Sequence, residues 1–122
     1  MQIDNFEDWE FECKCGCGTN SMSPDTLYKI EASRIDSDIP YIITSASRCE
    51  SYNELVGGVD DSAHVPLFEY SYAIDIACDE SCKRFIIVNS LLRAGFNRIG
   101  ISDTFIHVDD SPVKQANVIW TY

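Results

Sequence analysis

The sequence predicts a small α+β protein, because two helical patterns and several short strand patterns occupy a single short chain. Apolar residues at helical spacing predict helices over residues 24–35 and 81–94. The chain has 122 residues, of which 45% are hydrophobic, and this is enough for one core without obligatory crosslinks. We find no internal repeat and no interdomain linker, so we expect one domain over residues 1–122.

The first twelve residues are predicted to form an extended arm. They contain three aromatic residues, Phe6, Trp9 and Phe11, among acidic neighbours. Because aromatic rings bury large apolar areas, we expect all three to pack against the body of the domain.

The first helix has a predicted start. Ser23 suits the N-cap, and Pro24 suits the first helical position, where its missing N–H would be unpaired anyway. Leu27, Ile30 and Ile35 then form an apolar stripe that is expected to face the core.

The second helix is predicted from residues that recur at helical spacing and from the glycine that ends it. These residues are Cys82, Phe85, Ile86, Asn89 and Leu92, followed by Gly95. We expect both helices to be scaffold.

Short β-rich segments predict the strands. They occupy residues 40–45, 72–77, 98–101 and 105–108, and residues 118–122 are expected to form a final edge strand. A tight turn at residues 102–104 joins two of these strands into a hairpin. Residues 46–71 are assigned no helix or strand.

The two histidines of the chain, His64 and His107, each have an aspartate nearby in the sequence, Asp75 and Asp109 respectively. Two imidazoles and one carboxylate form the ligand set of a catalytic zinc, which keeps one position open for water. Strand alternation puts Asp75 on the face opposite its isoleucine neighbours, so Asp75 and His107 converge if their strands pair, and the preceding loop delivers His64. Hydrogen-bonded histidines and a turn aspartate are the alternative interpretation.

Charge and hydropathy exclude several classes of function. Nine basic and twenty acidic residues give a net charge of −11, which would repel a phosphate backbone, so no nucleic-acid binding is expected. No apolar run reaches the length of a membrane span. The N-terminus lacks the basic and apolar regions of a signal peptide, so we expect synthesis in the cytoplasm.

Six cysteines are many for such a chain. Cys13, Cys15 and Cys17 form a C-x-C-x-C run, Cys49 stands alone, and Cys78 and Cys82 are four positions apart. Three interpretations stay open: free thiols, disulfides formed after release, or a second, structural zinc on the three N-terminal thiolates. The missing export signal favours free thiols for most of them.

An ordered set of motifs carries a family resemblance. It comprises residues 11–18, 43–45, Arg48-Cys49, Asn53, Val56-Gly57-Gly58, Ser62-x-His64, Ala73-x-Asp75-Ile76, Gly95-Phe96, residues 98–101 and residues 105–109. In this order, the chain resembles the zinc D-alanyl-D-alanine carboxypeptidase-like peptidases of the Hedgehog/DD-peptidase fold, especially the short phage-encoded and bacterial members.

The resemblance implies a central antiparallel sheet with flanking helices and one zinc held by His64, Asp75 and His107. It implies hydrolysis of peptide bonds in bacterial peptidoglycan stem peptides, commonly next to D-amino acids. It also implies that Arg48 and Ser62 contact the substrate. A surface ion pair for Arg48 and a turn hydroxyl for Ser62 are the alternatives.

Two features depart from the family pattern. The spacing from His64 to Asp75 is longer than usual and lacks a glycine, as if residues near 66–70 were inserted. Many relatives carry an acidic general base three residues before the last histidine, where this chain has Thr104. Asp103 is therefore the first choice for this base, and Asp109 is the second choice, or a group that orients a ligand imidazole.

The sequence thus predicts a monomeric zinc peptidase that acts on the cell wall after release from the cell or as part of a virion. Such an enzyme could serve a phage in host-cell lysis or in entry into the host. The alternatives are a zinc-containing wall-binding module without turnover and a structural virion protein.

Overall fold

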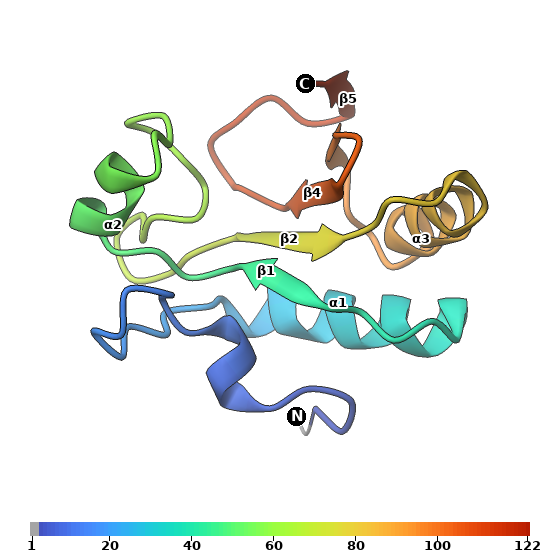
Figure 1. The fold of residues 1–122 in the computed structure, drawn as a ribbon, viewed down its shortest axis with the longest axis horizontal. Helices are drawn as coiled ribbons and strands as arrows, with labels where there is room; N and C mark the ends of the chain where they lie inside the picture. Colours follow the sequence, from blue (N-terminus) through green and yellow to red (C-terminus); the bar gives the residue numbers. More distant parts are fainter. Residues whose placement is uncertain (1–2) are drawn as a thin grey trace.

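The structure is a computed structural model that describes residues 3–122, and it confirms the α+β class. Along the chain it contains η1 (Asp8–Phe11), α1 (Pro24–Ser37), β1 (Ile43–Ser45), α2 (Glu50–Leu55), β2 (Ala73–Ala77), α3 (Ser81–Arg93), β3 (Arg98–Ile101), β4 (Phe105–Asp109) and β5 (Val118–Thr121). Helices α2 and α3 lie at opposite ends of the molecule, with the strands between them (Figure 1).

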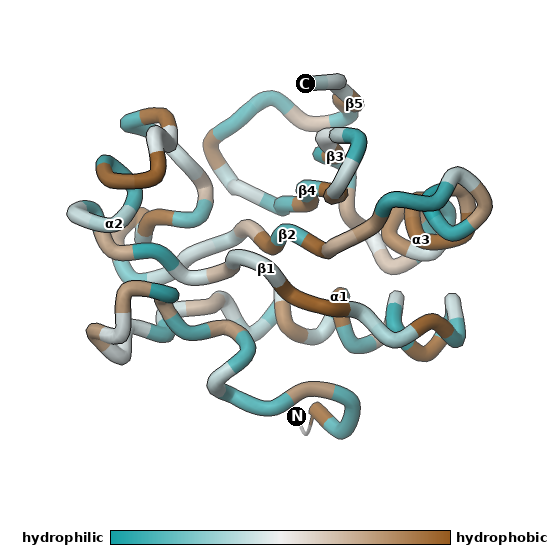
Figure 2. Tube along the Cα trace, viewed as in Figure 1, coloured by the Kyte–Doolittle hydropathy of each residue, from teal (hydrophilic) through white to brown (hydrophobic). Residues whose placement is uncertain are grey.

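Alternation along β2 separates the two faces of the sheet. Hydrophobic and hydrophilic positions follow one another along this strand (Figure 2). Ile74 and Ile76 are fully buried on one face, while Asp75 between them points to the other. One face of the sheet therefore builds the core and leaves the other face for a site.

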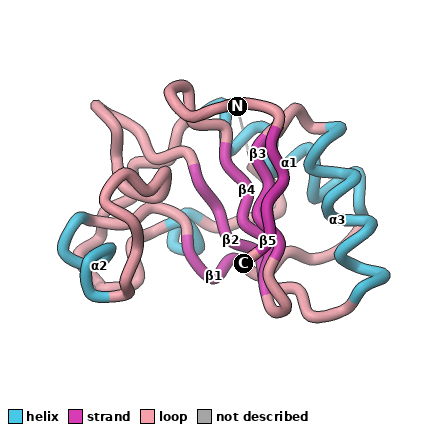
Figure 3. Tube along the Cα trace, turned by 90° about the horizontal axis from the view of Figure 1, so that it is seen from above, coloured by secondary structure: helices cyan, strands magenta, loops and turns pink. Residues whose placement is uncertain are grey.

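The five strands form one sheet in the order β1-β2-β4-β3-β5. The first four are antiparallel, as predicted, whereas β5 runs parallel to β3 at the edge. The strands lie side by side in Figure 3, between α2 and α3. The sheet is therefore mixed, because residues 110–117 cross back before β5 begins.

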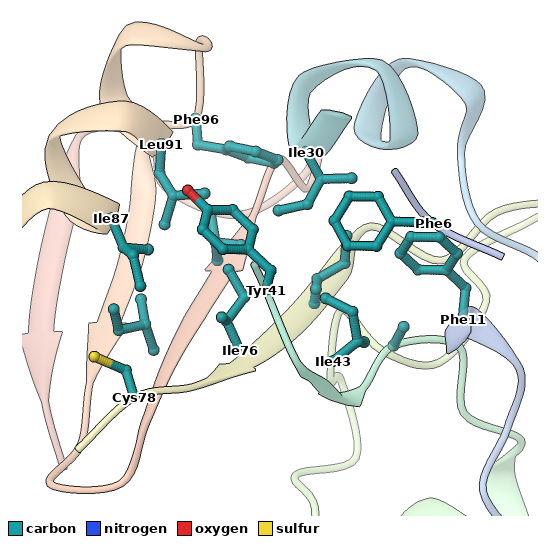
Figure 4. Packing of buried hydrophobic residues seen from close by; sticks show 14 of the residues in the cluster. Phe6, Phe11, Ile30, Tyr41, Ile43, Ile76, Cys78, Ile87, Leu91 and Phe96 are labelled. Carbon is teal, nitrogen blue, oxygen red and sulfur yellow. The ribbon is translucent and has the colours of Figure 1, made fainter. Parts of the chain in front are cut away.

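The core fills the space between the sheet and the helices α1 and α3. Figure 4 shows Ile30 of α1, Ile87 and Leu91 of α3, and Ile76 of β2 converging with Tyr41. All five side chains are at most 5% exposed. This packing holds β2 and β4 in place, and these strands carry two of the predicted metal ligands.

The N-terminal arm packs on the core with two of its three rings. Phe6 and Phe11 are buried, with ring centroids 5.3 Å apart, whereas Trp9 is 66% exposed. Residues 8–11 form a short 3-10 helix, so the arm is not fully extended. The prediction was wrong for Trp9, because this helical turn buries Phe11 and leaves Trp9 exposed.

Helix α1 begins as predicted, with Ser23 at the N-cap position and Pro24 as first residue. Ile30 is buried, but Ile35 is 62% exposed, and Ser33 is buried in its place against the Tyr41 hydroxyl at 2.8 Å.

Helix α3 buries a different face from the one that its spacing predicted. Cys82, Phe85, Ile86 and Leu92 are exposed, whereas Ile87, Ser90 and Leu91 face the core. Apolar residues occur around most of this helix, so periodicity alone does not select the buried face. Packing against α1 and the sheet selects it.

Helix α2 lies within residues 46–71, to which the sequence assigned no element. Its N-cap is Cys49, whose sulfur accepts a hydrogen bond from the Tyr52 N–H at 3.4 Å.

Within the described residues, no helix is long and apolar enough to cross a membrane.

Candidate metal centre

The register of the sheet places Asp75 and His107 directly opposite each other in neighbouring strands β2 and β4. His107 Nδ1 lies 2.9 Å from Asp75 Oδ1. The structure therefore brings these two residues together on the face that strand alternation predicts.

His64 reaches the same point from the loop before β2. Main-chain hydrogen bonds hold this loop: the Arg48 N–H donates to the His64 carbonyl, and the Tyr72 N–H donates to the Ala63 carbonyl, both at 2.9 Å. His64 Nε2 then lies 3.2 Å from Asp75 Oδ1. One ligand atom from each of the three residues lies within 4.8 Å of the others.

Hydrogen bonds on the far side of each imidazole determine which nitrogen can bind a metal. His64 Nδ1 lies 2.8 Å from the carbonyl oxygen of Ala46, which can only accept, so Nδ1 carries a proton and the neutral imidazole has its lone pair on Nε2. His107 Nε2 donates to Asp109 Oδ2 at 2.7 Å, which frees Nδ1. In the neutral imidazoles, which are the forms that bind metal, both lone pairs face Asp75. This arrangement, with each ligand imidazole oriented by an acceptor behind it, fits a zinc ion.

Asp109, which orients the His107 imidazole, is itself buried and hydrogen-bonded. It is 1% exposed and accepts hydrogen bonds from Arg98 Nε at 2.8 Å and from the Ser111 N–H at 3.1 Å. Burial alone would raise the pKa of Asp109, but the hydrogen bond from His107 outweighs it and lowers that pKa below its usual value.

The metal-free site is a cluster of mutually stabilised charges. Burial by itself would raise the pKa of Asp75, but hydrogen bonds from His107 and His64 hold that pKa well below its usual range. Burial would lower the pKa of His107, yet the hydrogen bonds to Asp109 and Asp75 outweigh it and raise that pKa. A cation bound here would take over the role of the ring protons that face Asp75.

The three ligand residues lie in a groove of about 370 Å³. Trp120 and Tyr122 of the C-terminal segment form one wall, and the Trp120 ring lies 5.4 Å from the His107 ring between their centroids. Gly100 makes room for this wall, because a Cβ there would come within 2.6 Å of the Trp120 ring. Sequence reasoning treated Trp120 and Tyr122 only as part of an edge strand. Their spacing of two was the signal that both face one side.

Arg48 lines the groove and is almost fully buried. Its Nη1 donates to Asn53 Oδ1 at 2.9 Å and its Nη2 donates to Ser45 Oγ at 3.0 Å. The nearest carboxylate oxygen that it pairs with is Asp75 Oδ2, at 4.0 Å. The Nε of Arg48 has no hydrogen-bond partner among the described residues. Arg48 therefore lies beside the metal ligands with only a long ion pair to a carboxylate.

Ser62 also lines the groove, and its hydroxyl accepts the His64 N–H at 3.2 Å. This bond is that of a turn hydroxyl, which was the alternative interpretation, and it still leaves the hydroxyl at the groove wall.

Asp103, the first choice for the general base, lies outside the groove. It is exposed in the turn between β3 and β4, where its main-chain carbonyl accepts a hydrogen bond from Arg84. Asp103 precedes His107 by four positions and lies in the turn before β4 begins at Phe105, away from the ligands. Of the two aspartates, Asp109 is the one that lies beside His107.

The cysteines of the C-x-C-x-C run lie together, and Cys49 joins them. The sulfur atoms of Cys13, Cys15, Cys17 and Cys49 lie within 4.8 Å of one another. Cys78 and Cys82 lie elsewhere, and all six thiols are free. The sequence did not pair Cys49 with the run, because α1 and β1 separate them along the chain.

This fold and this set of ligands define a metalloprotein of the hydrolase type, with a mononuclear site in a groove. The profile of the family described as Peptidase M15 matches residues 4–109, and the chain belongs to this family of zinc D-alanyl-D-alanine carboxypeptidase-like peptidases. The match includes all three ligands and Asp109 but not the wall formed by Trp120 and Tyr122. A search of curated proteins found no match.

Proposed function

We propose that this protein is a zinc-dependent peptidase that hydrolyses peptide bonds in bacterial peptidoglycan stem peptides. A D-alanine-type carboxypeptidase or endopeptidase activity is the form that we expect. The observation that carries this proposal is the convergence of two imidazole lone pairs and one carboxylate within 4.8 Å in an open groove. Membership of the Peptidase M15 family supports it.

The residues of the site divide the work as follows. His64, Asp75 and His107 would hold the zinc, which when bound lowers the pKa of its water and polarises the scissile carbonyl. Asp109 keeps the His107 imidazole in the tautomer that binds metal. Arg48 binds a carboxylate or carbonyl oxygen of the substrate, because it is the cation of the groove with no directly bonded carboxylate.

The charge of the groove supports an anionic substrate group. The whole chain carries a net charge of −11, yet Arg48, Arg98 and Lys114 all line this groove. Arg98 pairs with Asp109 at 2.8 Å and Lys114 pairs with Asp61 at 3.0 Å, whereas Arg48 comes no closer than 4.0 Å to Asp75, so Arg48 is the cation that we assign to the ligand. A free C-terminal carboxylate of a stem peptide suits it, which favours the carboxypeptidase form.

One observation favours a second candidate, a zinc-containing wall-binding or virion module with weak turnover. Among the residues that line the groove, the only carboxylates are Asp75 and Asp109, and both are engaged by histidines. The described part of the groove therefore lacks a free carboxylate to accept the proton of an attacking water.

Digestion of purified cell walls separates the two candidates. We expect the zinc-loaded protein to release D-alanine or to create new amino termini, both detected by mass spectrometry of the muropeptides. Chelation should stop the reaction, and added zinc should restore it. Binding to the walls without any product would instead support the module, and absence of both would contradict both candidates.

A further inference from the structure

Four thiols at the N-terminal end of the domain have the spacing of a metal site. The Sγ–Sγ distances are 3.4 Å for Cys13–Cys15 and 3.7 Å for both Cys13–Cys49 and Cys15–Cys49. Tetrahedral zinc with Zn–S bonds of about 2.3 Å separates its sulfur ligands by about 3.8 Å. A disulfide needs about 2.05 Å. The observed spacing therefore matches sulfurs that share one ion.

Three of these thiols come from one closed loop. The Cys13 N–H donates to the Thr19 carbonyl at 2.8 Å and closes the loop. Gly16 and Gly18 have φ values of +89° and +82°, which side chains rarely adopt. This loop is tight enough to present three thiols from one short segment.

Main-chain donors point at two of the sulfurs. The Cys49 N–H donates to Cys13 Sγ, and the Tyr52 N–H donates to Cys49 Sγ, both at 3.4 Å. Main-chain N–H groups of this kind can also donate to sulfur atoms that bind a metal.

We propose that Cys13, Cys15, Cys17 and Cys49 bind a second zinc ion, which is structural. Four thiolates close the coordination shell and leave no position for water or substrate. This site is separate from the His64, Asp75 and His107 centre, and its existence does not depend on the proposed peptidase activity.

The position of Cys49 indicates which two segments the second zinc would link. Cys49 follows Arg48, and the same segment supports His64 through the Ala46 carbonyl and the Arg48 N–H. On its other side the Ser47 N–H donates to the Phe11 carbonyl at 3.1 Å. A zinc bound to Cys49 would therefore clamp the N-terminal arm to the segment that positions the groove arginine.

Metal content tests the proposal directly. Reduced protein purified with zinc should contain two ions per chain by elemental analysis. His64→Ala should retain the cysteine-bound ion, Cys15→Ser should retain the other, and Cys82→Ser should retain both because Cys82 is an exposed thiol outside the cluster. Circular dichroism checks that each variant is folded.

Thiol reactivity provides a second measurement that works even where a variant fails to fold. In the wild-type protein, zinc should slow alkylation of the exposed Cys15 and Cys17 at least tenfold, and it should leave the equally exposed Cys82 unchanged. Cobalt in place of zinc should show thiolate charge-transfer absorption that His64→Ala retains.

Several results would contradict the proposal of a second zinc. They are a single zinc per chain in the reduced wild-type protein, equal alkylation of all three exposed thiols with and without zinc, or a disulfide within the cluster in freshly prepared protein. If His64→Ala instead lost every ion while Cys15→Ser lost none, the histidine centre alone would bind metal. Failure of wall digestion would leave the two-zinc result untouched.

Discussion

The histidine centre and the cysteine cluster are two possible metal sites built on different kinds of backbone. Asp75 and His107 stand in register on paired strands, and each imidazole has an acceptor behind it. The cysteines come from a glycine-containing loop and a helix N-cap, and Cys15 and Cys17 are exposed. The core therefore preorganises the histidine centre without metal, whereas the cysteine cluster would rely on the proposed ion to hold its shape.

Loss of a ligand from the histidine centre should have the largest effect. His64→Ala should lower wall-hydrolysing activity more than about 100-fold, because removal of even a group behind a ligand costs about 10–100-fold. The fold should persist, since β2 and β4 pair without His64. Glu69→Ala on the same loop is the control. Full activity in His64→Ala would show that the site is misassigned.

Asp109→Asn should have the next largest effect. We expect zinc affinity to fall about 10–100-fold, since His107 loses the acceptor that orients it. Asp110→Asn, the same change one residue further on, should leave affinity unchanged because Asp110 pairs with Lys29 instead. A competition titration with a zinc-sensitive dye measures both variants. A loss of kcat with unchanged zinc affinity would instead assign Asp109 to proton transfer.

Chelation should affect the two regions unequally. Removal of all metal should speed hydrogen exchange in residues 13–19 by an order of magnitude or more, because few buried contacts hold that loop. The amides of β2 and β4 should remain protected by the sheet. Hydrogen-exchange mass spectrometry of wild type and Cys82→Ser makes the comparison. Equal deprotection of both regions would remove the proposed contrast.

The pH dependence of stability should show the smallest effect, a shift of a few degrees in Tm. In the metal-free protein the pKa of His107 is raised, so protonated His107 stabilises the fold. This contribution is fully present below about pH 6.5 and is lost as the pH rises through the raised pKa. The pKa of Asp75 is lowered, so ionised Asp75 stabilises the fold. This contribution is fully present above about pH 3.8 and is lost as the pH falls through the lowered pKa.

The metal-free Tm should therefore be highest between these two values. Zinc binding needs neutral imidazoles, so the Tm of the loaded protein should instead rise as the histidines lose their protons. Thermal denaturation with and without chelator checks the two opposite slopes, and parallel slopes would contradict them.

Sequence reasoning succeeded where local pattern and tertiary contact agree. The alternation around Asp75 and His107 predicted which face each residue occupies, and the register then placed them opposite each other. It failed on α3, where apolar residues around the helix allow several buried faces. It also did not foresee that the turn before β4 leaves Asp103 exposed and outside the groove.

By itself, the sequence determined the α+β class and the helix start at Pro24, because both depend on local propensity. It also determined the family of the chain, because the motifs that include the three ligands occur in a fixed order. Only the tertiary structure decided that Cys49 joins the C-x-C-x-C run, that Asp109 lies behind His107, and that Trp120 covers Gly100. Each of these contacts joins side chains whose meeting depends on how the strands and loops pack, and neither periodicity nor spacing encodes that packing.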